Sequence, residues 1–144
     1  MSSTPRILIV EDDRAMCLSL IDLLEASEWC VEALPRAERL ADRLEAFQPD
    51  VILSDVRMPG MSGLEFCHKF RMMSQDTYAY FILVTSKSDK AEVARGLDSG
   101  ADDFLTKPVD NSELRARITA GERIIRMQRE LTETNRLISD TLGE

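Results

Sequence analysis

The chain has 144 residues, which is enough for one domain with a hydrophobic core of its own. Its formal net charge of −8 argues against direct binding to DNA or RNA, because these polyanions require a basic surface. No apolar run approaches the roughly 20 residues that span a bilayer, and the first residues lack the charged and apolar regions of a secretory signal.

Five short apolar runs predict strands. The run Val51-Ile52-Leu53 does not alternate with polar residues, which is typical of a strand that is covered on both faces. Strands are predicted at 6–10, 29–34, 51–55, 80–84 and 101–105. Helices are predicted after Asp13, from Pro35, after Ser62, over 89–98 and from Asn111 onward.

The helix predictions depend on apolar residues at helical spacing. Such residues are Ala15, Leu18, Ile21, Leu23 and Leu24 in the first helix, and Leu64, Phe66, Cys67 and Phe70 in the third. In the last helix they are Leu114, Ile118 and Ile125, with a gap at Gly121. Strands that alternate with helices predict an α/β fold, in which a five-stranded parallel sheet carries helices on both faces.

The predicted strands end on residues that can carry chemistry. Glu11 and Asp12 follow the first strand, Asp55 ends the third, Thr85 follows the fourth and Lys107 follows the fifth. Because the carboxyl ends of parallel strands share one edge of the sheet, these side chains should converge. Clustered carboxylates favour a hard cation such as Mg²⁺, and a lysine with a hydroxyl could bind phosphoryl oxygens. The pattern predicts phosphoryl transfer onto the carboxylate of Asp55, with Lys107 stabilising the transition state.

Four segments resemble the receiver domain of bacterial two-component response regulators. They are Ile7-Leu8-Ile9-Val10-Glu11-Asp12, residues 55–63, Leu83-Val84-Thr85-Ser86 and residues 100–108, within a resemblance that covers roughly residues 5–125. The resemblance implies a doubly wound, flavodoxin-like (βα)5 sheet in the strand order 2-1-3-4-5. It also implies a receiver domain at 1–125 and a protruding C-terminal helix at 126–144.

The resemblance implies a role for each acid. Asp55 would accept a phosphoryl group from a histidine kinase or a phosphotransfer protein. Glu11 and Asp12 would hold Mg²⁺ together with Asp55 and the backbone carbonyl of Arg57, and Asp12 would be the more direct ligand. Glu11 stands where many relatives have aspartate, so its longer side chain should reach the metal through water. Arg57 places a long cation beside the acceptor.

The resemblance also implies a conformational switch. Phosphorylation would draw Thr85 toward the phosphoryl group, and Phe104 would move into the space that Thr85 leaves. The face made by the fourth helix, the fifth strand and the terminal helix would then change. Phe104 stands where many relatives have tyrosine, and it lacks the tyrosine hydroxyl. The bond between Lys107 and Pro108 is a candidate cis peptide.

Each of these residues also has a simpler interpretation when it is taken alone. The phosphorylation site is favoured only because all of them occur together, each at the expected place in the sequence. Asp12 or Asp13 could be a helix cap, Asp55 a turn residue, Thr85 a strand residue, Lys107 a solvated lysine and Phe104 a core aromatic.

Three functions remain to be compared. The first is a signalling switch that is not an enzyme. The second is a phosphatase with an aspartyl-phosphate intermediate, although Arg57 stands where such enzymes carry a second acid. The third is a scaffold that is not phosphorylated.

The three cysteines match no zinc or redox spacing. We therefore expect Cys17, Cys30 and Cys67 to be small apolar side chains of a protein in the reducing cytoplasm.

The last part of the terminal helix has a heptad pattern. Ile124, Leu131 and Ile138 recur every seven residues, with Gly121, Gln128, Asn135 and Leu142 at the interleaved positions. The pattern predicts a parallel two-stranded coiled coil, hence a homodimer, in which Asn135 sets the register. The alternative is a solvated helix without a partner. In relatives such a helix leads to an output domain, and the sequence leaves open whether this chain is a fragment or a stand-alone regulator.

Overall fold

The computed structural model describes residues 4–35, 40–58, 60–73, 78–86, 91, 94 and 100–142. The strands are β1 (Arg6–Val10), β2 (Cys30–Leu34), β3 (Val51–Asp55), β4 (Tyr80–Thr85) and β5 (Asp103–Thr106). The helices are α1 (Arg14–Glu25), α2 (Leu40–Phe47), α3 (Gly63–Met73) and α5 (Asn111–Leu142). Of the helix predicted at 89–98, only Ala91 and Ala94 are described, and both are helical.

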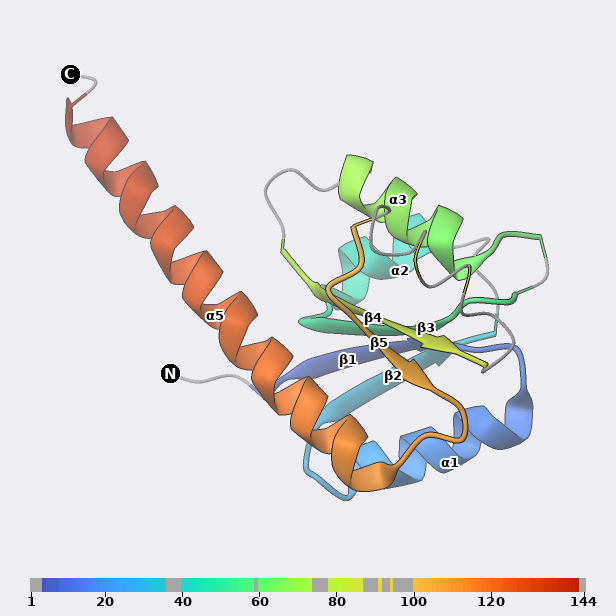
Figure 1. The fold of residues 1–144 in the computed structure, drawn as a ribbon. Helices are drawn as coiled ribbons and strands as arrows, with labels where there is room; N and C mark the ends of the chain where they lie inside the picture. The colour runs from blue at the N-terminus through green and yellow to red at the C-terminus, as the bar shows by residue number, and fades with distance from the viewer. Residues whose placement is uncertain are drawn as a thin grey trace.

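The strands form one parallel sheet in the order β2-β1-β3-β4-β5, which confirms the predicted fold. Strand β3 lies at the centre, and all five of its residues are buried. Helices α2 and α3 cover one face of the sheet, and α1 and α5 cover the other (Figure 1). Ile52 of β3 packs in the core of the first face, and Leu53 packs in the core of the second. The central strand is therefore covered on both sides, as its apolar run predicts.

Three local predictions need correction. Leu18 was expected on the buried stripe of the first helix but is exposed, because α1 faces the sheet through Leu20 and Leu24, one turn apart. Cys30, which was expected to be a small apolar side chain, is exposed at the start of the outermost strand β2. Strand β5 begins at Asp103 and not at 101, because the carboxylate of Asp102 accepts a hydrogen bond from the backbone N–H of Phe81 at 2.8 Å.

Helix α5 docks on the sheet through Leu114, Ile118, Gly121 and Ile125, which confirms the predicted stripe. The helix then projects well beyond the sheet (Figure 1). Gly121 permits the close approach of α5 to β4, since a Cβ atom there would lie 2.3 Å from Cδ2 of Tyr80. No described helix is both long and apolar enough to cross a membrane.

Gly121→Ala should destabilise the protein, although alanine normally stabilises a helix by about 1 kcal/mol relative to glycine. The added methyl group must displace the Tyr80 ring or lift α5 from the sheet, and we expect the free energy of unfolding to fall by about 1–3 kcal/mol. Urea denaturation measures this change. Thr119→Ala, at an exposed position of the same helix, is the control and should change stability little. A stabilised Gly121→Ala variant would contradict the packing described.

Candidate functional site

The carboxyl ends of β1, β3, β4 and β5 carry the predicted site residues. Glu11 and Asp12 follow β1, Asp55 is the last residue of β3, Thr85 is the last of β4, and Lys107 follows β5. The parallel register places these ends at the same edge of the sheet. Asp13, and not Asp12, caps α1, because its carboxylate accepts the backbone N–H of Met16 at 3.2 Å. The carboxylate of Asp12 is therefore not used for the cap.

Asp55 lies at the centre of this group, and it is only 7% exposed. Its Oδ2 accepts a hydrogen bond from the Lys107 amine at 2.8 Å, and its Oδ1 accepts the backbone N–H of Arg57 at 3.2 Å. The backbone N–H of Lys107 in turn donates to the Thr85 carbonyl at 2.7 Å, which ties the lysine to β4. The peptide bond from Lys107 to Pro108 is cis. The Asp55 carboxylate is thus oriented by the Lys107 cation and the backbone donor of Arg57.

Glu11 is a buried acid in an unfavourable position. Its side chain is 3% exposed, and its Oε1 has no hydrogen-bond partner among the described residues. Burial raises the pKa of Glu11 from 4.5 to about 8, with further contributions from hydrogen bonding to Asp55 and from the charge of Asp55. The Lys107 amine is 3.8 Å from Oε1 and opposes this shift only in part.

Lys107 keeps its charge in this environment. Burial acts to lower the pKa of the amine, but the hydrogen bond to Asp55 and the charges of Asp55, Glu11 and Asp12 together raise it above its usual value. The site therefore offers a permanent cation next to three acids.

The three acids suit a divalent cation. One carboxylate oxygen from each of Glu11, Asp12 and Asp55 lies within 4.8 Å of the others. Carboxylate oxygens are the ligands that Mg²⁺ prefers, and the buried Oε1 of Glu11 has only the distant Lys107 amine at 3.8 Å and no hydrogen bond among the described residues. The donor set therefore fits Mg²⁺, with Asp12 the most exposed of the three acids.

The raised pKa of Glu11 predicts how the stability of the metal-free protein depends on pH. A neutral Glu11 stabilises the fold fully below about pH 4.5, and this contribution is lost as the pH rises through about 8. Glu11→Gln cannot ionise, so it should be more stable than the wild type at pH 8.5 by about 2–4 kcal/mol. The difference should fall below about 1 kcal/mol at pH 5. Chemical denaturation in EDTA at both pH values measures it, and an equal difference at the two would contradict the assignment.

Thr85 and Phe104 differ in their surroundings. The Thr85 side chain is buried, and its hydroxyl donates to the Ser86 carbonyl at 3.2 Å. Phe104 is 39% exposed on β5, so it is not a core aromatic. Asp103 is half-buried and accepts hydrogen bonds from Arg117 at 3.0 Å and from the Tyr80 hydroxyl at 3.5 Å. Asp102 is exposed but pairs with Arg71 at 2.5 Å.

Gly63 is a site residue that the sequence marks only as the last residue of the segment 55–63. A Cβ atom at Gly63 would lie 2.2 Å from the backbone oxygen of Asp55 and 3.1 Å from Cδ2 of Leu83. The N–H of Gly63 donates to the Val56 carbonyl at 2.8 Å. The start of α3 therefore packs directly against the backbone of Asp55, and only glycine leaves room for it.

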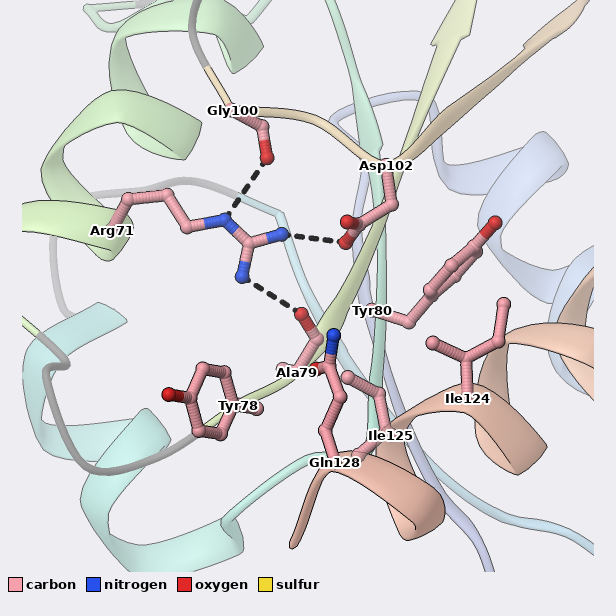
Figure 2. Close-up of a pocket in the computed structure, with 9 residues that line it drawn as sticks. All are labelled: Arg71, Tyr78, Ala79, Tyr80, Gly100, Asp102, Ile124, Ile125 and Gln128. Carbon is pink, nitrogen blue, oxygen red and sulfur yellow. Dashed lines mark hydrogen bonds and ion pairs between the residues drawn. The ribbon is translucent and has the colours of Figure 1, made fainter. Parts of the chain in front are cut away.

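A second feature lies at the opposite edge of the sheet. A cavity of about 310 Å³ is bounded by α5, the start of β4 and the segment before β5. Arg71 of α3 forms one wall, where its guanidinium donates to the carbonyls of Gly100 and Ala79 and to the carboxylate of Asp102 (Figure 2). Ile124, Ile125 and Gln128 of α5 form the other wall. This cavity is separate from the acidic site.

Comparison with known proteins gives concordant matches. The family model described as "Response regulator receiver domain" matches residues 7–119. The chain is 35% identical over 116 residues to the phosphate regulon transcriptional regulatory protein PhoB of Rhizobium meliloti, covering 81% of this chain and 51% of that protein. The chain thus spans about half the length of this curated relative.

Solved structures agree with this match. A response regulator receiver domain protein (CheY-like) from Methanospirillum hungatei has a TM-score of 0.80 and 28% identity, with 88% of this chain and 99% of that chain covered. Full-length FixJ from B. japonicum has a TM-score of 0.79 and 27% identity, with 99% of this chain and 67% of that chain covered.

Proposed function

The chain belongs to the response regulator receiver domain family, and on this premise we propose that it is a phosphoacceptor signalling switch whose acceptor is Asp55. The observation that carries the proposal is the contact of the Asp55 carboxylate with the Lys107 amine at 2.8 Å, beside Glu11 and Asp12. A cation, a nearly buried acceptor and two further acids are the groups that phosphoryl transfer to a carboxylate requires.

The donor would be a histidine kinase or a phosphotransfer protein. An Asp55 oxygen forms a bond to the phosphorus of the donor's phosphohistidine, the phosphorus–nitrogen bond breaks, and its electron pair returns to the imidazole. The N–H of Arg57 holds Asp55 Oδ1, which leaves the carboxylate in a fixed orientation. The Lys107 amine already lies against Oδ2, so it can bind a phosphoryl oxygen after a small movement.

The metal would be Mg²⁺, held by Asp12, Glu11 and Asp55 with the backbone carbonyl of Arg57. When bound, it supplies positive charge that offsets the repulsion between the acids and the incoming phosphoryl group. The clustered carboxylates support this assignment, as does the buried Oε1 of Glu11, which accepts no hydrogen bond from the described residues.

The switch would use Thr85 and Phe104. In this structure the Thr85 hydroxyl is bound to the Ser86 carbonyl and the Phe104 side chain is exposed. Once Asp55 is phosphorylated, the Thr85 hydroxyl turns to a phosphoryl oxygen and Phe104 moves inward. Both residues belong to neighbouring, paired strands, since Leu83 of β4 is in register with Phe104 of β5. The surface of β5 and α5 then changes, which is the signal to an output domain or partner.

The chain would act by binding its partners and not by catalytic turnover. It would do so in the cytoplasm. Free cysteines are compatible with a reducing compartment, and the acidic net charge argues against direct contact with nucleic acid. The receiver domain would occupy residues 1–125, and 126–144 would form a helix through which two copies associate.

Intact-mass spectrometry after incubation with acetyl phosphate and Mg²⁺ tests the proposed function. A switch gives one added phosphoryl group that decays slowly and does not form in EDTA. A phosphatase releases phosphate with many turnovers and accumulates little adduct. Absence of any adduct from folded protein would refute the proposal and favour a scaffold.

A further inference from the structure

A hydroxyl group is buried in the central strand, directly before the proposed acceptor. Ser54 of β3 is fully buried, and its partners in the sheet register are Val10 of β1 and Leu83 of β4. Both partners are buried apolar residues, so an apolar side chain would suit this position. A buried hydroxyl costs free energy unless it forms a hydrogen bond. The packing of the core alone therefore gives no reason for a serine at this point.

Two acceptor atoms lie within reach of the Ser54 hydroxyl. It donates to the backbone carbonyl of Asp55 at 3.1 Å, and the sulfur of Met58 lies 4.0 Å from the hydroxyl oxygen. A hydroxyl has one proton to donate, and a thioether sulfur is only a weak acceptor. The main partner of Ser54 is therefore the backbone of Asp55, the residue whose side chain the proposed reaction uses.

The Asp55 carbonyl belongs to a peptide unit that is held on both sides. On one side its oxygen accepts the hydrogen bond from Ser54. On the other side the N–H of the same unit, which is that of Val56, donates to the Val84 carbonyl at 3.0 Å. Because a peptide unit is planar and tilts as one body, the two bonds together fix its orientation. Without the Ser54 hydroxyl the unit loses the bond at its oxygen and can tilt more freely.

The next peptide unit connects this arrangement to the carboxylate. The oxygen of the unit between Val56 and Arg57 accepts the N–H of Gly63 at 2.8 Å. The N–H of this unit is the group that donates to Asp55 Oδ1 at 3.2 Å. The two units share the Cα atom of Val56, so a tilt of the first unit is passed to the second. The Ser54 hydroxyl thus influences the orientation of the Asp55 carboxylate through two peptide units.

The start of α3 restricts the same carbonyl from another direction. The backbone of Gly63 lies so near that a Cβ atom there would be 2.2 Å from the Asp55 oxygen. The oxygen is therefore enclosed by the Ser54 hydroxyl and by the backbone of α3, and its position is tightly defined.

From these contacts we infer that Ser54 is a positioning residue for the phosphorylation of Asp55. Ser54 is fully buried, so it does not contact a phosphoryl donor in solution. It holds the Asp55 carbonyl, which fixes the Arg57 N–H and through it the carboxylate oxygen Oδ1. A nucleophile in a fixed orientation reacts faster, because small misplacements of the reacting atoms are costly. The inference rests on the proposed function, in which Asp55 is the acceptor.

The rate of adduct formation with acetyl phosphate and Mg²⁺, followed by intact mass, tests this role. Ser54→Ala removes only the hydroxyl and should lower the rate constant about tenfold. The variant should stay folded, because alanine suits the apolar surroundings of β3. Ser54→Thr keeps the hydroxyl and should restore most of the wild-type rate. A wild-type rate in Ser54→Ala would overturn the inference.

Ser62→Ala is the matched control, since it removes another serine hydroxyl from the segment around Asp55. The Ser62 hydroxyl caps α3 by accepting the N–H of Glu65 at 3.1 Å, and none of its described hydrogen bonds reaches Asp55. Loss of the cap should lower the melting temperature and leave the rate constant unchanged. Ser54→Ala should show the reverse, with a lower rate and a melting temperature that changes little. Equal losses of rate in the two variants would contradict a specific role for Ser54.

Met58→Leu separates the two acceptors of the Ser54 hydroxyl. Leucine has nearly the volume of methionine but offers no acceptor atom, so the bond from Ser54 to the Asp55 carbonyl should persist. The rate constant should therefore match that of the wild type. A loss as large as in Ser54→Ala would show that Ser54 acts through Met58, which is not the role inferred.

Amide hydrogen exchange, measured by NMR in EDTA, tests the geometry without phosphorylation. The amides of Val56 and Arg57 should exchange about tenfold faster in Ser54→Ala than in the wild type, and at the wild-type rate in Ser62→Ala. Unchanged exchange in Ser54→Ala would refute the proposed coupling. The failures are distinguishable. A wild-type protein that forms no adduct refutes the proposed function, whereas equal adduct rates in the wild type and Ser54→Ala refute the role of Ser54 alone.

Discussion

Asp55→Asn should abolish the phosphoryl adduct completely. An amide is too weak a nucleophile to attack phosphorus, whereas the carboxylate is held ready by Lys107 and by the Arg57 N–H. Asparagine has nearly the same shape, and its one amide oxygen can still accept one of these two hydrogen bonds, so the fold should be retained. Intact mass after incubation with acetyl phosphate and Mg²⁺ measures the loss.

Two controls accompany this variant. Asp22→Asn, an exposed position on α1, should form the adduct at the wild-type rate. Asp12→Asn keeps the acceptor but removes one proposed metal ligand, so it should form the adduct slowly and need more Mg²⁺. An adduct of unchanged yield in Asp55→Asn would place the acceptor elsewhere and remove the basis of the proposed function.

Gly63→Ala should lower the free energy of unfolding more than Gly121→Ala does. The new Cβ atom would lie 2.2 Å from the backbone oxygen of Asp55, which belongs to the fully buried central strand and cannot move away. The start of α3 must shift instead, and this breaks its packing. We expect the free energy of unfolding to fall by about 2–4 kcal/mol, at or above the usual range for overpacking.

Thermal and urea denaturation measure this loss. Leu64→Ala, at the next position of α3, is only half-buried and should cost less. If Gly63→Ala stays folded, its phosphorylation should also slow, because the backbone of Asp55 is displaced. A variant that matches the wild type in both stability and phosphorylation rate would show that the close contact at Gly63 is relaxed in solution.

The sheet and the convergence of the site follow from local sequence patterns. Apolar runs such as 51–53 predict buried parallel strands. The parallel arrangement alone brings Glu11, Asp55 and Lys107 to one edge, although the first and the last are 96 positions apart. Strand order then follows from the resemblance to receiver domains, and the structure confirms it. These features are predictable because each depends on one short segment or on a general rule of topology.

Other contacts could not be predicted, because they depend on how distant segments meet. Arg129 and Asp50 are 79 positions apart, and nothing in either neighbourhood marks them as a pair. The exclusion of side chains at Gly63 arises from the backbone of Asp55 and not from a motif. Leu18 was misplaced because several apolar residues in α1 compete for the buried face and only the packed structure selects among them.

The position of the phosphoryl group is the most direct test of the central claim. Borohydride reduces a phosphoaspartate to homoserine, and peptide mass spectrometry then identifies the modified residue in wild-type protein treated with acetyl phosphate and Mg²⁺. We predict homoserine at position 55 and nowhere else. Modification at Asp12 or at the exposed His68, with Asp55 intact, would contradict the account.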